Sequence, residues 1–126
     1  METKFFICET CGNLITFVEN KGIPVMCCGK KMKELIPGTV DAALEKHVPD
    51  VTVNGNVVTV KVGSVEHPML EEHYIQFIYL QTTTGCQMKK LHPGEKPEAS
   101  FVLADGEQVE AVYEYCNLHG LWKSEQ

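Results

Sequence analysis

The sequence predicts an all-β protein of two parts: a small metal-stapled domain over residues 1–36 and an antiparallel β-sandwich over residues 37–126. Three observations support this prediction. Four of the six cysteines lie in the first 28 residues, and short β-prone stretches between Gly- and Pro-containing turns fill the rest of the chain. The length of 126 residues, with 44% hydrophobic and 22% charged side chains, suits one ordinary domain and a very small companion.

The first part contains two β-prone stretches, residues 4–7 and 14–18, broken by Cys-Gly and Lys-Gly turn signals. Its apolar content is too small for a self-sufficient core, because domains below about 40 residues usually need a metal or a crosslink. Pro37 stops the preceding strand pairing and Gly38 relaxes the backbone, so we expect the domain boundary near residue 37. A short helical turn is expected at residues 41–44.

The second part shows the period-two pattern of half-buried strands. Valines alternate on both sides of Asn54-Gly55, a dipeptide that tolerates positive φ and predicts a tight type I′ hairpin. Further strands are expected at residues 73–80, 88–91, 99–103 and 109–115. Six or seven short strands at this spacing are typical of an immunoglobulin-like antiparallel sandwich.

Charge and hydropathy exclude some classes of function. The formal net charge of -6 repels polyanions, so no nucleic-acid partner is expected. No apolar run approaches the length of a membrane span, so no membrane association is expected. The start, Met1-Glu2-Thr3-Lys4, lacks the layout of an export signal, which favours a cytoplasmic location.

The clustered cysteines predict a first metal site. Cys8-x2-Cys11 and the adjacent pair Cys27-Cys28 supply two thiolates from each of two loops, enough for a tetrahedral site that binds iron or zinc. Spacing alone leaves a structural zinc open, whereas a reducing cytosol disfavours disulfides. Gly12 and Gly29 follow the pairs and let backbone N–H groups approach the sulfurs.

A second constellation combines histidines with one cysteine. Cys116-x2-His119 follows a predicted strand at chelating spacing, His67 and His73 bracket the start of another strand, and His47 precedes the valine hairpin. Convergence at one end of the sandwich would create a site of four imidazoles and one thiolate. Zinc closes at four ligands, so five ligands favour an octahedral-tending iron with one vacancy. The remaining histidine and cysteine are not expected to bind metal: His92 is interpreted as a solvated loop histidine and Cys86 as an ordinary thiol.

Together these residues resemble one family, the desulfoferrodoxins or two-iron superoxide reductases, over nearly the whole chain. The motifs that carry the resemblance are, in chain order, Cys8-x2-Cys11, Cys27-Cys28-Gly29, Glu45-Lys46-His47-Val48-Pro49, the segment 62–69 with His67, His73, and the segment 113–123 with Cys116 and His119.

The resemblance implies a desulforedoxin-like, rubredoxin-like N-terminal domain with iron on Cys8, Cys11, Cys27 and Cys28. It also implies a sandwich domain with a second iron in an equatorial plane of imidazoles and an axial thiolate. The ligands implied for that iron are His47, His67, His73, His119 and Cys116. Family members are usually cytoplasmic homodimers that reduce superoxide to hydrogen peroxide with one external electron and two protons.

The resemblance further suggests roles for two residues beside His47. Lys46 would hold an ammonium over the vacant position and draw superoxide in, and Glu45 would offer a carboxylate to oxidised iron. Taken alone, both would be ordinary surface side chains. A small carrier such as rubredoxin is the implied electron donor.

Two other functions stay open from the sequence. One is a zinc-stapled ribbon fused to an immunoglobulin-like interaction module, with incidental histidines. The other is an iron electron carrier without catalysis.

Overall fold

The computed structural model describes residues 3–40, 42 and 44–126, and of Glu45 it describes the backbone only. The chain divides into two compact units, residues 1–36 and 37–126, and each is described by itself. The described residues form short β-strands and a single four-residue helix, so the all-β prediction is confirmed.

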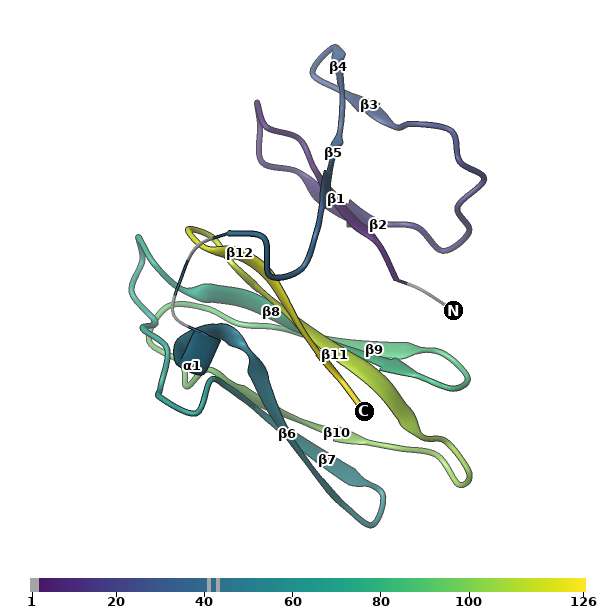
Figure 1. Ribbon diagram of the computed structural model, residues 1–126, viewed down its shortest axis with the longest axis vertical. Helices are drawn as coiled ribbons and strands as arrows, with labels where there is room; N and C mark the ends of the chain where they lie inside the picture. Colours follow the sequence, from purple (N-terminus) through teal and green to yellow (C-terminus); the bar gives the residue numbers. More distant parts are fainter. Residues whose placement is uncertain (1–2, 41, 43) are drawn as a thin grey trace. The chain divides into compact units, whose positions relative to one another are not determined.

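The first unit consists of a three-stranded antiparallel sheet and a separate hairpin (Figure 1). The sheet has the order β2-β1-β5, and the hairpin pairs β3 with β4. The bounds are β1 (Phe5–Ile7), β2 (Leu14–Thr16), β3 (Met26–Cys27), β4 (Lys30–Lys31) and β5 (Lys33–Leu35). Among the described residues of this unit only Phe5, Cys8 and Met32 are buried. A core this small agrees with the expectation that the unit depends on a metal or a crosslink for stability.

The second unit is a sandwich of two antiparallel sheets, seen as two layers in Figure 1. One sheet has the order β10-β7-β6 and the other the order β12-β11-β8-β9. The bounds are β6 (Pro49–Asn54), β7 (Val57–Val62), β8 (Ile75–Thr82), β9 (Cys86–Lys90), β10 (Glu98–Val102), β11 (Val109–Cys116) and β12 (Gly120–Glu125).

Alternate residues of the strands face inward and form the core of the sandwich. Val58, Val60 and Val62 of β7 are buried against Ile78 and Leu80 of β8. Because side chains alternate between the two faces of a strand, the valine pattern places every second residue in this core. The predicted sandwich is therefore confirmed.

The valine hairpin forms as predicted, but its turn differs by one residue. Asn54 pairs with Val57, so the two loop residues are Gly55 and Asn56 rather than Asn54 and Gly55. Only Gly55 has positive φ, at 62°, as expected for a glycine in the first loop position of a type II′ turn. The type I′ assignment is thus wrong, because strand pairing extends one residue further than the dipeptide alone indicates.

The short helix α1 (Leu44–His47) leads into β6. The sequence predicted a helical turn at residues 41–44, of which 41 and 43 lie outside the described residues; the helix itself starts at Leu44. Val48 N–H donates to the Leu44 carbonyl at 3.0 Å, and Gly63 N–H donates to the Val48 carbonyl at 3.0 Å. These bonds fix the end of α1, and so His47, next to the end of β7.

Candidate metal centres

The four cysteines of the first unit converge. Their sulfurs lie within 4.8 Å of one another, and Cys11 Sγ is 3.6 Å from Cys27 Sγ. Two thiolates bound tetrahedrally at about 2.3 Å from one ion lie about 3.8 Å apart. The spacing therefore fits a single metal ion, and all six cysteines of the chain are free thiols.

Two tight backbone turns bring the cysteine pairs together. In the first, Gly12 N–H donates to the Cys8 carbonyl at 2.9 Å. In the second, Cys28 and Gly29 form the two-residue loop of the β3–β4 hairpin, with φ of 52° and 75°. Positive φ at both loop positions is the signature of a type I′ turn, which demands Gly at the second position and strains Cys28 at the first.

Hydrogen bonds to the sulfurs come from one backbone N–H group and from the side chain of Asn13, to which the sequence analysis gave no role. Cys11 N–H donates to Cys8 Sγ at 3.5 Å, and the Asn13 side-chain amide donates to Cys27 Sγ at 3.6 Å. The Cys11 N–H bond is the main cause that lowers the pKa of Cys8 to about 6. Hydrogen bonds with the Cys11 and Cys8 sulfurs raise the pKa of Cys28 to about 12. A bound cation would favour the thiolate form of the four sulfurs.

The second donor set lies at one end of the sandwich. His47 ends α1, His67 and His73 lie in the connection from β7 to β8, and Cys116 and His119 flank the turn from β11 to β12. Their donor atoms lie within 4.8 Å of one another. The structure thus brings together all five residues that the sequence analysis singled out.

The four imidazoles form a closed cycle. Neighbouring ring centroids are 4.7 Å apart for His47 and His67 and 4.8 Å for His67 and His73. The other two sides, from His73 to His119 and from His119 to His47, are both 4.9 Å. Neighbouring planes meet at 78° to 87°. Four nearly equal sides and nearly perpendicular neighbours are what four imidazoles around one ion produce.

The nitrogens themselves have the spacing and protonation that a metal requires. His47 Nε2 is 3.1 Å from both His67 Nε2 and His119 Nδ1. Two nitrogens at that spacing and at right angles would each lie about 2.2 Å from a shared ion, close to ordinary metal–imidazole bonds of about 2.0–2.1 Å. His67 Nδ1–H donates to the Pro68 carbonyl at 2.6 Å, which leaves the Nε2 lone pair for a metal.

Burial favours the neutral form of two of these imidazoles, those of His67 and His73. It is the main cause that lowers the pKa of His67 to about 4, and it also lowers the pKa of His73. His73 Nε2 is buried without any hydrogen-bond partner. An unpartnered buried ring nitrogen is costly unless it binds a cation, so the donor set fits a metal ion.

Cys116 is fully buried at this site. Burial raises the pKa of its thiol, and the N–H groups of His119 and Leu118 oppose that shift. Asn117 holds the turn in place: its Oδ1 accepts from Tyr74 N–H at 2.9 Å and its Nδ2 donates to the Glu72 carbonyl at 3.0 Å. These two bonds tie the Cys116–His119 turn to the loop that carries His73.

Trp122 supports the histidines from the side. Its Nε1–H donates to the His119 carbonyl at 2.9 Å, and its ring stacks on His47 with centroids 5.1 Å apart and planes at 27°. Sequence reasoning assigned roles to neither Trp122 nor Asn117. Polar contacts to a backbone carbonyl leave no spacing signal in the sequence.

Lys46 and Glu45 precede His47 on α1. Lys46 is exposed, and its positive charge contributes to the lowered pKa of His73, after burial and His119. The side chain of Glu45 lies outside the described residues. His92 makes an exposed contact of 2.8 Å with Glu95, and Cys86 is exposed; neither belongs to the two donor sets.

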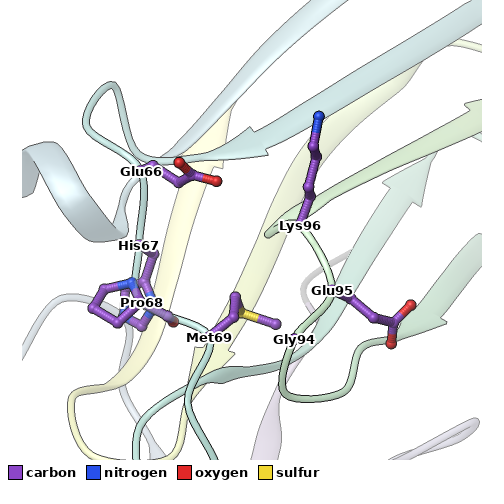
Figure 2. A pocket seen from close by; sticks show the side chains of 7 residues that line it. All are labelled: Glu66, His67, Pro68, Met69, Gly94, Glu95 and Lys96. Carbon is purple, nitrogen blue, oxygen red and sulfur yellow. The ribbon is translucent and has the colours of Figure 1, made fainter.

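A pocket of about 380 Å³ adjoins the histidine site (Figure 2). Figure 2 shows Glu66 and Lys96 on opposite sides of this pocket and Met69 directed toward the Gly94 turn. His67 also lines it, although the residue is only 2% exposed. His67 therefore presents only a small part of its surface to this pocket.

The fold and the two donor sets define an all-β metalloprotein with two separate mononuclear sites, one of four cysteines and one of four histidines and a cysteine. The profile of the desulfoferrodoxin family matches residues 39–125. The chain belongs to the desulfoferrodoxin family, as the sequence motifs predicted, and its donor sets fit the two iron sites expected from that resemblance.

Individual relatives support this membership. The chain is 49% identical to the desulfoferrodoxin of Syntrophotalea carbinolica, covering 94% of this chain and 92% of the relative. It is 43% identical to that of Nitratidesulfovibrio vulgaris, covering 97% and 95%. The crystal structure of the superoxide reductase from Treponema pallidum superposes with a TM-score of 0.84 at 38% identity, covering 98% of each chain. Among the described residues, no helix has the length and apolar character to cross a membrane.

Proposed function

We propose that this chain is a superoxide reductase, an oxidoreductase that reduces superoxide to hydrogen peroxide. The observation that carries the proposal is the closed cycle of four imidazoles next to a buried thiol. The solved relatives named superoxide reductases, from Treponema pallidum and Giardia intestinalis, support it. The alternative is an interaction module in which the histidines have no metal to bind. Such a module would have no reason to bury a ring nitrogen without a hydrogen-bond partner, as His73 Nε2 is buried here.

We assign residues 37–126 as the catalytic domain, with His47, His67, His73, His119 and Cys116 as the ligands of its iron. Residues 1–36 are assigned as the desulforedoxin-like domain, with iron on Cys8, Cys11, Cys27 and Cys28. The iron of the catalytic domain supplies, when bound, one electron and an open coordination position. The side chains around it are proposed to bind the iron, attract the substrate and bind the oxidised site.

The protein's own groups have three tasks. The imidazoles and the Cys116 thiolate are proposed to hold the iron and to leave one position for the substrate. Lys46, exposed on α1, places a positive charge where an anion enters, and its effect on the His73 pKa supports that position. The two protons that hydrogen peroxide requires are proposed to come from solvent. Glu45 is proposed to bind the oxidised site, because a hard oxygen ligand favours the ferric state.

The test measures the products of a known superoxide flux with the iron-loaded protein and a chemical reductant. Reduction yields one hydrogen peroxide per superoxide and consumes one electron from the reductant. Dismutation would yield half as much peroxide and release oxygen, and that outcome would contradict the proposal. A closed electron-carrier site would also contradict it: its spectrum would not change when azide is added to the oxidised protein.

We further propose that the protein works in the cytoplasm as a homodimer and takes its electron from a small carrier such as rubredoxin. The family resemblance supports these three statements. Sedimentation analysis of the iron-loaded chain tests the dimer, and a monomer at all concentrations would contradict it.

A further inference from the structure

We propose that the β3–β4 hairpin of the first unit is the docking surface for an acidic one-electron carrier protein, held by Lys30 and Lys31. The proposal rests on the proposed function, because superoxide reduction needs an electron from outside the chain. It names the surface that receives the donor and the charge that the donor must carry.

The hairpin places one of its two lysines, Lys30, directly beside a cysteine of the first site. In the antiparallel register, Lys30 pairs with Cys27 and Lys31 with Met26. Directly opposed residues of such a pair have Cβ atoms about 4.5–5.5 Å apart and share a face of the sheet. Lys30 therefore lies on the same face as Cys27, one cross-strand neighbour away, and both lysines are exposed.

The other cysteine loop has a basic neighbour as well. Lys33, exposed at the start of β5, approaches Glu9 at 3.9 Å, and Glu9 lies between Cys8 and Cys11. Lys33 is therefore paired with an acidic residue. In the described chain, neither Lys30 nor Lys31 has an ion pair within 4.0 Å. The two hairpin charges remain available to a partner.

The metal site itself reaches the surface at this place. Cys11 and Cys28 are exposed, and Cys27 is partly so. Two apolar side chains close to Cys27 in the sequence are exposed to solvent: Met26 is 58% exposed and Ile23 is 73% exposed. Exposed sulfur donors with apolar and cationic neighbours suit a transient partner that must bring a redox centre close, because charge guides the encounter and apolar contact excludes water.

The distribution of charge along the chain selects an acidic partner. Residues 1–36 carry five lysines against four acidic residues, whereas residues 37–126 carry six lysines against thirteen acidic residues. An acidic carrier is repelled by the second unit and can be attracted only where cations are concentrated. In the complex one electron leaves the reduced carrier and enters this protein, and the carrier departs oxidised.

The test compares two double variants of the iron-loaded protein with equal loss of charge. Lys30→Gln/Lys31→Gln removes the hairpin charges, and Lys89→Gln/Lys90→Gln removes an adjacent exposed pair on β9 of the second unit. The probe is a reduced rubredoxin, a small acidic carrier. The readouts are its affinity by titration calorimetry and the rate of its oxidation by stopped-flow absorbance, from low to high salt.

At low salt, we expect the hairpin variant to have an affinity for rubredoxin about tenfold lower than the wild type and to oxidise it about tenfold more slowly. At high salt both differences should disappear, because the charges are screened. The β9 variant should match the wild type. Equal effects of the two variants, or wild-type binding that does not weaken with salt, would overturn the proposal. If the double variant does not fold, the single variant Lys30→Gln takes its place against Lys89→Gln, with the same expected difference. Superoxide consumption with a chemical reductant should be the same in all three proteins, and its absence would count against the proposed function instead.

Discussion

Gly120 controls the geometry of the Cys116–His119 turn, and its replacement by alanine should disturb the histidine site selectively. Gly120 has a φ of +80°, and a Cβ at this position would lie 3.0 Å from Val40 Cγ2. It pairs with Cys116 at the start of β12, directly after His119. Gly106 is a matched control: its φ is also +80°, but a Cβ there meets nothing within 4 Å.

The two substitutions share one cost and differ in another. A side chain at left-handed φ costs about 1–2 kcal/mol, which applies to both positions. Gly120→Ala adds overpacking against Val40, which typically costs about 1–3 kcal/mol. We therefore expect the free energy of unfolding to fall by about 1–2 kcal/mol for Gly106→Ala and by about 2–5 kcal/mol for Gly120→Ala.

Urea denaturation followed by tryptophan fluorescence measures both losses, because Trp122 lies beside the site. Visible absorbance of the iron-loaded proteins reports on the second centre. Gly106→Ala should keep the thiolate absorbance of that centre, whereas Gly120→Ala should shift or lose it as Cys116 and His119 move. Equal losses of stability with identical spectra would refute the reasoning, because the contact with Val40 would then have no consequence.

Three further predictions follow from the same structure. Lys46→Ala should slow the bimolecular reaction with superoxide by about tenfold and flatten its dependence on ionic strength, both measured by pulse radiolysis. Lys46→Arg should restore the rate and the salt dependence. Unchanged kinetics in Lys46→Ala would remove Lys46 from the entry path. Cys27→Ser should abolish the absorbance of the four-sulfur site and the order of residues 1–36, the latter measured by NMR. The variant should still reduce superoxide when a chemical reductant is supplied. Loss of turnover in a variant whose second unit remains folded would show that the units depend on each other. Burial raises the pKa of Glu114 well above its usual range, and both of its oxygens lack partners. The folded state therefore keeps a proton that the unfolded chain releases, so the stability from this group is complete below about pH 4.3 and is lost as the pH rises toward the folded pKa. Glu114→Gln should flatten that decline in urea midpoints between pH 4 and pH 7, and parallel curves for both proteins would contradict this.

Local spacing in the sequence carried much of the information about the sites. Cys8-x2-Cys11 and Cys116-x2-His119 bring two donors together within one loop, because three residues span at most about 10 Å and a turn shortens that distance. The alternation of valines identified the core face of β7 in the same way, since a strand presents every second residue to one side. Both signals depend only on residues close to one another in the chain.

The type II′ turn at Gly55 shows where this local information ends. The same dipeptide can enter a turn in two registers, and the pairing of Asn54 with Val57 selects one of them. Register depends on which side chains the whole sheet buries, because a one-residue slip moves every side chain to the other face. The sequence could therefore predict the hairpin but not its loop residues.

By itself, the sequence determined the chemical types of the two donor sets, the small core of the first unit and the strand pattern of the second. Only the tertiary structure decided that His47, His67 and His119 meet within hydrogen-bonding distance across 20 and 72 residues of chain. It also supplied the Pro68 carbonyl, Asn13 and Asn117, which orient the donors. The reason is physical: covalent geometry limits what neighbouring residues can do, whereas the meeting of distant ones depends on strand register and packing across the whole unit.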